Sequence, residues 1–189
     1  RAKEVLISSG SIERPIVFGN NDTPGVMLSS AAKEYIKVYG VLVGKKPLIF
    51  TNNDSGYETA IEFKKNGVNA LILDTRKDPQ SEIVEEAKNL GIDIKFSYVV
   101  VVAQGYKKVK SADIAKISDD KEQLGIIENV KCDCICVSGF WTPTIHLASQ
   151  SGNKTKFNEE IDAFVPGISK QNETTLGAAN GTYTLNETL

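Results

Sequence analysis

One strand–turn–helix unit constrains this sequence more than any other feature. The stretch LIFTNNDSGYETAIEF, Leu48–Phe63, runs from a short apolar strand through a turn into an amphipathic helix. Folds that bind dinucleotides place the hexad G-x-G-x-x-G at such a turn. Here the hexad reads T-N-N-D-S-G, so Gly56 is the one glycine that remains.

The three glycines of a working hexad have different roles. The first permits the tight turn, the second lets the backbone approach the pyrophosphate, and the third lets helix and strand pack closely. Thr51, Asn53 and Gly56 hold these places here. Asn tolerates left-handed geometry, so the turn can still form, but its side chain occupies space that a pyrophosphate needs.

An acidic residue follows at the spacing of a ribose-binding group. Asp74 lies 74 − 56 = 18 positions after Gly56, close to the interval of about 20 residues that is typical of such acids. We interpret the hexad as a structural relic that preserves the fold without meeting the needs of phosphate binding. The alternative is a modified site in which Asn52, Asn53 or Ser55 donates directly to the ligand.

The surrounding pattern predicts an α/β fold with a parallel sheet. PLIF and VNALILDTR read as strands; the helix between them has Asp54 as its N-cap and ends at Gly67. A second helix, DPQSEIVEEAKNLG, has Asp78 as cap and Pro79 at its first position, and the strand IDIKFSYVVVVAQG follows. This strand–helix–strand–helix–strand order predicts a βαβαβ unit with right-handed crossovers.

The rest of the chain alternates between strand and helix signals. Residues 96–130 lack the helical period and predict an antiparallel β-meander, whereas VMLSSAAKEYIKVYG over residues 26–40 has helical spacing. DCICVSGF predicts a buried strand, and TPTIHLASQ predicts a helix. The tail beyond Gly152 is rich in loops, with short strands expected near DAFVPG and TTLGAANG and a helix opening in GTYTLNETL.

No set of side chains predicts catalysis or metal binding. Strand alternation places Cys132, Cys134 and Cys136 on one face, where we expect them to be small core residues; C-x-C-x-C lacks the spacing of a zinc site. His146, the single histidine, lies in an apolar helical pattern and is expected to be packed rather than a general base. We therefore predict no catalytic residue and no metal ligand.

Composition excludes two classes of partner. The 189 residues are 41% hydrophobic and carry a net charge of −2, with lysines and acids interleaved, so we expect no nucleic acid partner. No apolar run is long enough to predict a membrane span. The chain begins at Arg1 without an initiator Met, which we interpret as a segment cut from a longer polypeptide, and we expect a reduced, cytoplasmic protein.

Ordered motifs along nearly the whole chain resemble the alpha subunits of heterotetrameric sarcosine oxidases. ISSGSIERPIVFGNNDTPGVM resembles A-T-G-A-x-E-R-P-x-x-F-x-x-N-D-x-P-G-V-M, with Ser8 and Ser9 in place of Ala and Thr. FTNNDSGY resembles F-T-N-N-D-S-A-Y, including the lost glycines. VSGFWTPTIHLASQSGNK resembles V-S-G-G-W-N-P-x-V-H-L-x-S-Q-S-x-G-K, with Phe140 in place of the second Gly of that motif, and GAANG also matches.

The resemblance implies the two-dinucleotide-domain fold of the glutathione reductase type. Residues 44–131 are then the inserted NADH-type domain with the degenerate hexad, and residues 1–43 and 132–189 are parts of the first dinucleotide-binding domain. In the first domain, the resemblance implies these cofactor-contacting residues: Ser9, Gly10, Gly177, Ala178, Ala179, Asn180, Gly181, Tyr183 and Leu185. The degenerate second site is formed by Thr51, Asn53, Gly56 and Asp74.

The resemblance also implies an activity for the parent complex. Such oxidases demethylate sarcosine to glycine with formation of hydrogen peroxide, and the one-carbon unit passes to tetrahydrofolate in a further domain. NAD binds in the alpha subunit, FAD and FMN are carried in the complex, and beta, gamma and delta subunits are the partners. Two alternatives stay open: the alpha subunit of an opine or amino-acid dehydrogenase, and a non-catalytic module for subunit docking.

Overall fold

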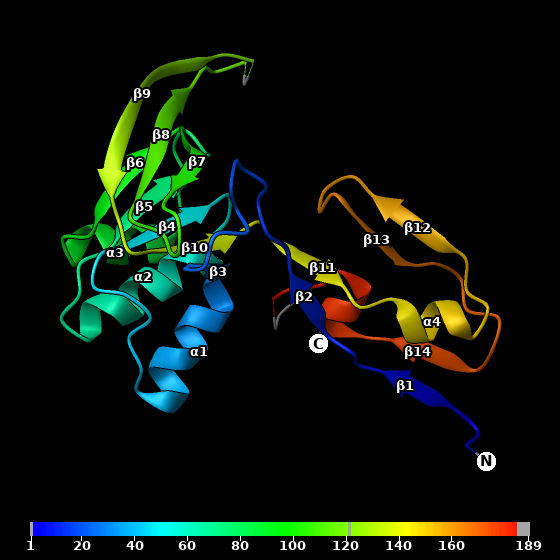
Figure 1. Cartoon of the computed structure of the whole chain (residues 1–189). Coiled ribbons are helices and arrows are strands. Elements are labelled where there is room, and N and C mark those ends of the chain that lie inside the picture. The colour runs from blue at the N-terminus through cyan, green and yellow to red at the C-terminus, as the bar shows by residue number, and fades with distance from the viewer. Residues whose placement is uncertain (1, 121, 185–189) are drawn as a thin grey trace. The chain divides into compact units, whose positions relative to one another are not determined.

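The computed structural model describes residues 2–120 and 122–184, which form two compact units. Unit 1 combines Arg1–Glu13 with Trp141–Leu189, and unit 2 is the continuous stretch Arg14–Phe140. These bounds differ from the sequence-based segments, because residues 14–43 and 132–140 pack with residues 44–131 in unit 2. Each unit is described by itself below (Figure 1).

Unit 2 is built on a parallel sheet of five strands in the order β3-β10-β4-β5-β6. A second sheet, antiparallel and three-stranded, has the order β7-β8-β9. The elements are β3 (Val26–Leu28), α1 (Ser29–Tyr39), β4 (Pro47–Thr51), α2 (Ser55–Lys65), β5 (Leu71–Asp74), α3 (Glu82–Asn89), β6 (Asp93–Phe96), β7 (Tyr98–Gln104), β8 (Ser111–Ile117), β9 (Leu124–Lys131) and β10 (Cys134–Ser138). The predicted βαβαβ unit and the predicted meander are both confirmed.

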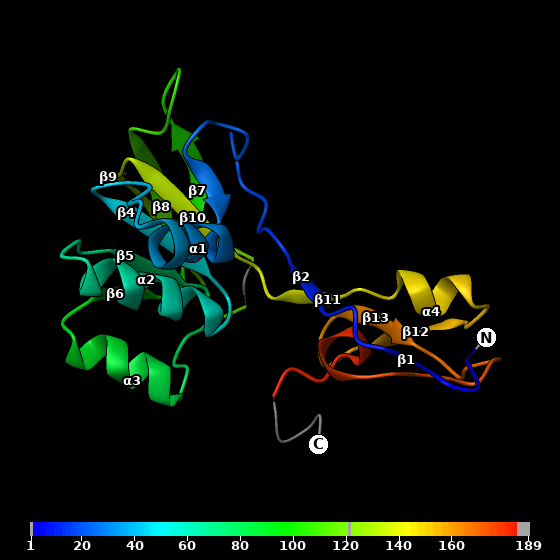
Figure 2. The same cartoon turned by 90° about the horizontal axis from the view of Figure 1, so that it is seen from below.

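The two faces of the parallel sheet are covered by different layers (Figures 1 and 2). One face packs against α1, α2 and α3 in an apolar cluster that includes Ile49, Tyr57 and Ile72. The opposite face packs against the meander in a second cluster that includes Phe50 and Leu73. All five residues of β4 and of β10 are buried, as expected for the central strands of a parallel sheet covered on both faces.

Two predicted helix starts are wrong by several residues. The helix expected over residues 26–40 begins at Ser29, because Val26–Leu28 pairs with β10 as strand β3. The helix expected to begin at Pro79 begins instead at Glu82, with Ser81 as its N-cap in an extended conformation. The residue before a proline is biased away from helical geometry, and here the chain stays irregular through Pro79 until Ser81.

Two other backbone features depart from the sequence-based reading. The single strand expected over IDIKFSYVVVVAQG is divided into β6 and β7 by Ser97, whose φ of 57° turns the chain from one sheet into the other. Phe140 has a φ of 81°, a left-handed conformation that favours glycine. This is the position at which the resembling motif V-S-G-G-W carries its second Gly.

The three cysteines are buried, but they do not share one face as expected. Cys134 and Cys136 lie in β10 and pack on the helix side of the sheet. Cys132 precedes β10 and packs on the meander side. The alternation argument failed because the strand begins only at Cys134.

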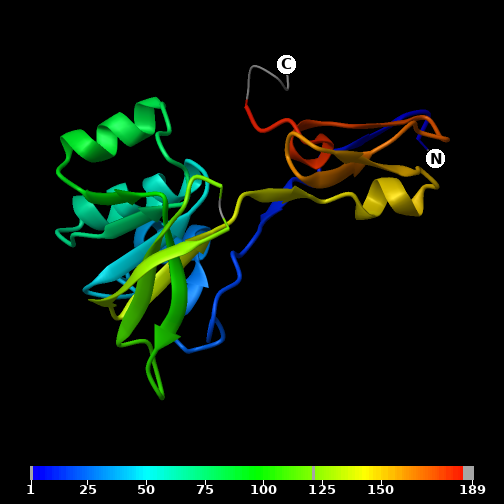
Figure 3. The same cartoon turned by 90° about the horizontal axis from the view of Figure 1, so that it is seen from above.

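The described residues of unit 1 form three two-stranded sheets and two short helices (Figure 3). Its elements are β1 (Val5–Ile7), β2 (Ser11–Glu13), β11 (Trp141–Pro143), α4 (His146–Gln150), β12 (Thr155–Asn158), β13 (Ala163–Pro166), β14 (Glu173–Thr175) and the 3-10 helix η1 (Gly177–Asn180). β1 pairs in parallel with β14, whereas β2–β11 and β12–β13 are antiparallel. None of the described helices is long and apolar enough to cross a membrane.

Candidate functional site

The T-N-N-D-S-G loop lies at a topological switch point of unit 2. It leaves the carboxyl end of β4, from which the chain proceeds through α2 to β5 on one side, while β10 lies on the other side. Ligands of open α/β sheets bind outside the carboxyl ends of strands at such a point. The prediction that this loop connects a strand of the parallel sheet to a helix is therefore correct.

Asn53 is directed into the protein rather than toward an open crevice. Its side-chain Nδ2 donates to the carbonyl oxygen of Ser138 at 3.0 Å, at the end of β10, and to Asn52 Oδ1 at 3.0 Å. Its Oδ1 accepts from the backbone N–H of Ser55 at 2.9 Å. The amide thus links the two strands at the switch point and uses a first-turn donor of α2 that a ligand phosphate would otherwise receive.

Thr51 and Gly56 hold this turn together by close contact. Thr51 Oγ1 donates to the carbonyl oxygen of Asn53 at 2.8 Å and accepts from its N–H at 3.1 Å. A Cβ added to Gly56 would lie 2.6 Å from the Cβ of Thr51, a distance that real Cβ atoms do not reach. Gly56 therefore acts as the packing glycine, the role assigned to it from the sequence.

Asp74 is fully buried at the carboxyl end of β5, where Tyr57 and Arg76 both donate hydrogen bonds to its carboxylate. Tyr57 donates its hydroxyl to Asp74 Oδ2 at 2.7 Å, and Arg76 donates from Nη2 to the same oxygen at 2.9 Å. The backbone N–H of Arg76 adds a bond to Asp74 Oδ1 at 2.9 Å. The carboxylate at the expected ribose position is thus engaged inside the protein.

Asp54 takes part in this network instead of capping α2. It makes no side-chain capping bond, because its backbone is already helical; its Oδ1 lies 2.8 Å from Arg76 Nη2. The expected cap is therefore wrong, and Asn53 supplies the oxygen that accepts from the helix start. The guanidinium of Arg76 joins Asp54 at the start of α2 to Asp74 at the end of β5.

The surroundings of Tyr57 and Arg76 keep the Tyr57 hydroxyl protonated and the Arg76 guanidinium positively charged. Burial raises the pKa of Tyr57, and the hydrogen bond to Asp74 raises it further, so the hydroxyl stays a donor. Burial lowers the pKa of Arg76, but the hydrogen bonds and charges of Asp74 and Asp54 outweigh it, and the net change is upward. Charged groups of both signs are therefore paired with one another between the end of β5 and the start of α2.

Three of the residues expected to contact a cofactor in the first domain, Ser9, Gly10 and Gly177, lie in unit 1 just beyond the carboxyl end of the β1–β14 pair. Ser9–Gly10 follows β1 and Gly177 follows β14; the two strands are joined in register, with Leu176 N–H donating to Ile7 O at 2.9 Å. Gly10 has a φ of +72°, and a Cβ added to it would meet no atom within 4 Å. Both loops thus begin at the carboxyl end of the parallel β1–β14 pair, and both contain small residues.

Several residues of this set have internal contacts in unit 1. Ser9 Oγ donates to Thr144 O at 2.8 Å, and Tyr183 donates its hydroxyl to Trp141 O at 2.7 Å. Ala179 is fully buried, and a Cβ on Gly181 would lie 2.9 Å from Val165 Cγ1. Ala178 and Asn180 belong to η1, and Leu185 lies outside the described residues. Their role in cofactor binding stays a prediction.

His146 is exposed, so the expectation of a packed histidine is wrong. α4 begins at His146 and buries Ala148 as its inward residue, which leaves His146 on the outer side. Within residues 2–120 and 122–184, no group of three His, Cys, Asp or Glu side chains is arranged to hold a metal ion.

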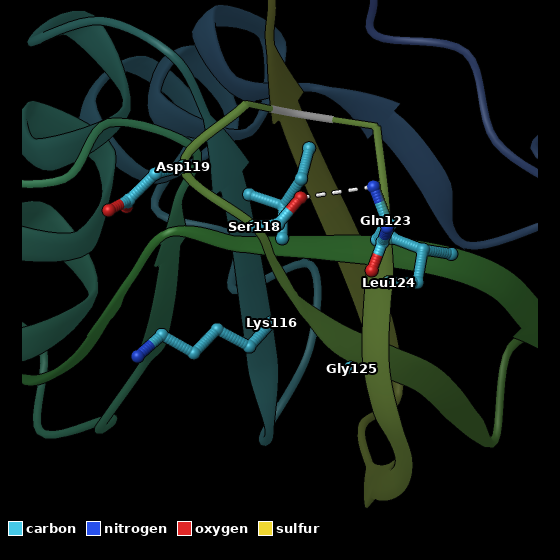
Figure 4. Close-up of a pocket in the computed structure, with 7 residues that line it drawn as sticks. Lys116, Ser118, Asp119, Gln123, Leu124 and Gly125 are labelled. Atoms are coloured by element: carbon cyan, nitrogen blue, oxygen red, sulfur yellow. Dashed lines mark hydrogen bonds between the residues drawn. The ribbon is translucent and has the colours of Figure 1, made fainter.

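The residues that line a hollow of about 320 Å³ at the β8–β9 hairpin do not form a candidate site (Figure 4). Its lining includes Lys116, Ser118, Asp119 and Gln123. Ser118 Oγ accepts from the N–H of Gln123 at 3.0 Å, and Asp119 pairs with Lys77 at 2.8 Å. Ser118 and Gln123 thus help to close the hairpin, and Asp119 takes part in a surface ion pair.

Sequence reasoning missed three residues of the switch-point network: Tyr57, Arg76 and Ser138. Tyr57 and Arg76 were detectable in principle, since one lies on the first turn of α2 and the other two residues after Asp74. Ser138 was not detectable, because its contact with Asn53 joins positions 85 residues apart.

Comparison with known proteins identifies relatives along nearly the whole chain, although no family model matches it. It is 33% identical to the sarcosine oxidase subunit alpha of Corynebacterium sp. (strain P-1) over 185 residues, 97% of this chain and 19% of that protein. It is 34% identical to the same subunit of Rhizobium meliloti (strain 1021), over 94% of this chain and 17% of that protein. The chain spans less than a fifth of the length of these relatives.

Solved structures share the fold at low identity. The T. acidophilum thioredoxin reductase matches with a TM-score of 0.76 and 17% identity, over 99% of this chain and 61% of that one. The Lactococcus lactis thioredoxin reductase matches with a TM-score of 0.71 and 15% identity, over 96% and 59%. L-proline dehydrogenase from P. horikoshii matches with a TM-score of 0.60 and 22% identity, over 94% and 30%.

These likenesses confirm the predicted fold, the two-dinucleotide-domain fold of the glutathione reductase type. The sequence matches confirm the resemblance on which that expectation was based. This chain is homologous, over almost all of its length, to one segment of the sarcosine oxidase alpha subunit.

Proposed function

We propose that this chain is the part of an oxidase alpha subunit that contributes unit 1 to a first, NAD-binding domain and unit 2 as a second dinucleotide domain that no longer binds. The observation that carries the proposal is the contrast between the two sheet edges. In unit 2 the switch point is filled by Asn53 and by the Asp54–Arg76–Asp74 network. In unit 1, Gly10 at the end of β1 faces open space.

The residues of unit 1 fit one edge of a dinucleotide site. Gly10 and Gly177 both have left-handed φ angles at the carboxyl end of parallel strands, where small residues let a ligand approach the backbone. In this proposal these loops bind and orient the pyrophosphate side of NAD. The remaining strands and the Gly-rich loop of that domain are supplied by polypeptide outside the 189 residues.

The parent complex, in this proposal, oxidatively demethylates sarcosine to glycine with formation of hydrogen peroxide. FAD and FMN, when bound in the complex, supply the redox chemistry, and a further domain passes the one-carbon unit to tetrahydrofolate. The contribution of this chain is to bind NAD, to scaffold the subunit and to take part in assembly with beta, gamma and delta subunits. We assign no catalytic residue within the described part of the chain.

Calorimetric titration of NAD⁺ and FAD tests this proposal. We expect the full-length alpha subunit to bind NAD⁺ saturably and the 189-residue chain to show no saturable binding, because its first domain is incomplete. Saturable binding to the 189-residue chain that Asn53→Ala abolishes would mean that T-N-N-D-S-G is a working site, and would overturn the proposal.

A further inference from the structure

Ser9 and Gly10 lie at a corner of unit 1 where the chain changes its pairing partner. Before the corner, β1 pairs in parallel with β14, and after it β2 pairs antiparallel with β11. Gly10 makes the corner with a φ of +72°, a left-handed conformation that glycine adopts readily. The hydrogen bonds at this corner therefore determine the shape of the loop that follows β1.

Thr144 holds the corner from the β11 side with both of its backbone groups. Its N–H donates to Gly10 O at 2.9 Å, which adds one rung to the β2–β11 ladder beyond the pair of Pro143 and Ser11. In a regular antiparallel rung, the N–H of the facing residue would bond to the carbonyl oxygen of Thr144 in return. Here that carbonyl oxygen accepts from Ser9 Oγ at 2.8 Å, so a side chain supplies the bond where the backbone turns away.

The bond to Thr144 uses the one hydrogen that the Ser9 hydroxyl can donate. A serine hydroxyl is a single donor, whereas the oxygens of a pyrophosphate only accept. Ser9 therefore does not donate to a phosphate while it holds the carbonyl oxygen of Thr144. Gly10 is different, because a Cβ added to it would meet no atom within 4 Å. At this corner, the open position is Gly10 and the adjacent hydroxyl is used within unit 1.

The corner is also fixed on the side of β14. Leu176 N–H donates to Ile7 O at 2.9 Å at the end of the parallel pair. Only Ser8 and Ser9 lie between this attachment and Gly10. Loss of the Ser9 hydroxyl would therefore loosen a short loop while the strand pairing on either side of it stays in place.

We propose that Ser9 is a positioning residue for NAD, which acts through Thr144 to hold Gly10 in the conformation that receives the pyrophosphate. The inference rests on the proposed function, in which the loops after β1 and β14 bind that side of the cofactor. It gives Ser9 an indirect role in place of the direct contact that the sequence resemblance implies. A loop that is held before binding loses less conformational freedom when the ligand arrives, and so binds it more tightly.

Three single variants of the full-length alpha subunit test this role. Ser9→Ala removes the bond to Thr144, and Ser9→Thr keeps a hydroxyl on the same residue. Ser169→Ala is the matched control, because Ser169 Oγ also donates to a backbone carbonyl of unit 1, that of Gln171, at 2.8 Å. For each protein we would measure the dissociation constant for NAD⁺ by calorimetric titration, and hydrogen exchange at the Thr144 amide without NAD⁺.

The amide of Thr144 reports on the corner because it donates to Gly10 O. We expect Ser9→Ala to raise the dissociation constant for NAD⁺ at least about threefold and to speed exchange of this amide at least about fivefold. Ser9→Thr and Ser169→Ala should keep both quantities within about twofold of the wild type.

Three results would overturn the positioning role. If Ser9→Ala binds NAD⁺ more weakly but exchange at Thr144 is unchanged, Ser9 contacts the cofactor itself. If exchange is faster but binding is unchanged, the bond only stabilises unit 1. If neither quantity changes, the Ser9 hydroxyl does not hold the corner.

Gly10→Asn separates failure of this inference from failure of the proposed function. Asn tolerates a left-handed φ, and its side chain would enter the open space beside Gly10, so we expect NAD⁺ to bind at least about tenfold more weakly. If Gly10→Asn weakens binding and Ser9→Ala does not, the positioning role alone fails. If Gly10→Asn leaves binding unchanged, or if the wild-type subunit does not bind NAD⁺, the proposed function fails as well.

Discussion

Gly56 shows at the scale of one residue why a glycine is retained when its two companions are lost. Its place is set by the contact between α2 and β4, not by a ligand. Gly56→Ala would force its Cβ against Thr51, so we expect the free energy of unfolding to fall by about 1–3 kcal/mol. Urea unfolding measures this. Gly125→Ala is the control, because there the added Cβ meets its nearest atom at 3.3 Å rather than 2.6 Å, and the loss should be smaller than that of Gly56→Ala.

The buried carboxylate of Asp74 makes Arg76 necessary for stability. Arg76→Gln leaves that carboxylate with Tyr57 but without a cation, and we expect a loss of about 3–5 kcal/mol. Lys77→Gln breaks an ion pair that is about three-quarters exposed on both sides and should cost less than about 1 kcal/mol. If the two variants unfold at the same urea concentration, the network is not what holds β5 and α2 together. Asp74→Asn in the Arg76→Gln background should recover part of the loss, because it removes the unpaired charge.

Cys132 predicts a dependence of stability on alkaline pH. The pKa of its thiol is raised to about 12 from an ordinary value of 9.0. Burial is the largest cause, and the electrostatic interactions with Cys134 and Asp133 add to it. The unfolded thiol therefore ionises first, so its contribution is complete below pH 9 and is lost as pH rises from about 9 to about 12. Relative to Cys132→Ala, the wild type should lose roughly 1.4 kcal/mol per pH unit within that range. Parallel stability curves for the two proteins between pH 8 and 11 would show that the thiol is not shielded.

At the scale of elements, the sequence predicted those helices and strands whose apolar residues recur with a clear local period. The strand and helix periods of residues 47–104 were sufficient for the βαβαβ order, and the loss of helical period predicted the meander. Val26–Leu28 was assigned to a helix because three apolar residues fit either period; its pairing with β10, over 100 residues away, decides for a strand. The parallel pairing of β1 with β14 is equally non-local and had no signal in either segment.

The β1–β14 pair carries its own prediction, because two parallel strands form a marginal sheet. Val5 and Leu6 of β1 are 47% and 69% exposed, whereas β4 lies between two strands and is fully buried. In the 189-residue chain we expect the amides of β1 to exchange hydrogen at least about a hundredfold faster than those of β4. In the full-length subunit this difference should shrink, as further strands complete the sheet. Equal protection of β1 and β4 in the 189-residue chain would contradict the proposal that unit 1 is incomplete.

At the scale of the whole molecule, the candidate sites of the two units differ in how much could be predicted. The hexad and Asp74 located the switch point of unit 2, because the motif is local in sequence. The filling of that site depends on Arg76 and Ser138, which lie outside the hexad, and on the direction in which Asn53 points. The unit 1 residues were named through a resemblance, and their grouping at the ends of β1 and β14 follows from a pairing that only the fold creates.

The measurement that tests the central claim most directly is the affinity of the full-length alpha subunit for NAD⁺ with one added carboxylate in each unit. Ala178→Asp places the charge in the 3-10 helix η1 after β14, and Asn52→Asp places it in the loop after β4, where the side-chain oxygen keeps its bond from Asn53. A carboxylate beside a bound pyrophosphate should weaken binding at least about tenfold. We predict that loss for Ala178→Asp and a change within about twofold for Asn52→Asp. The reverse result would show that the unit 2 switch point binds the dinucleotide, and would contradict the account.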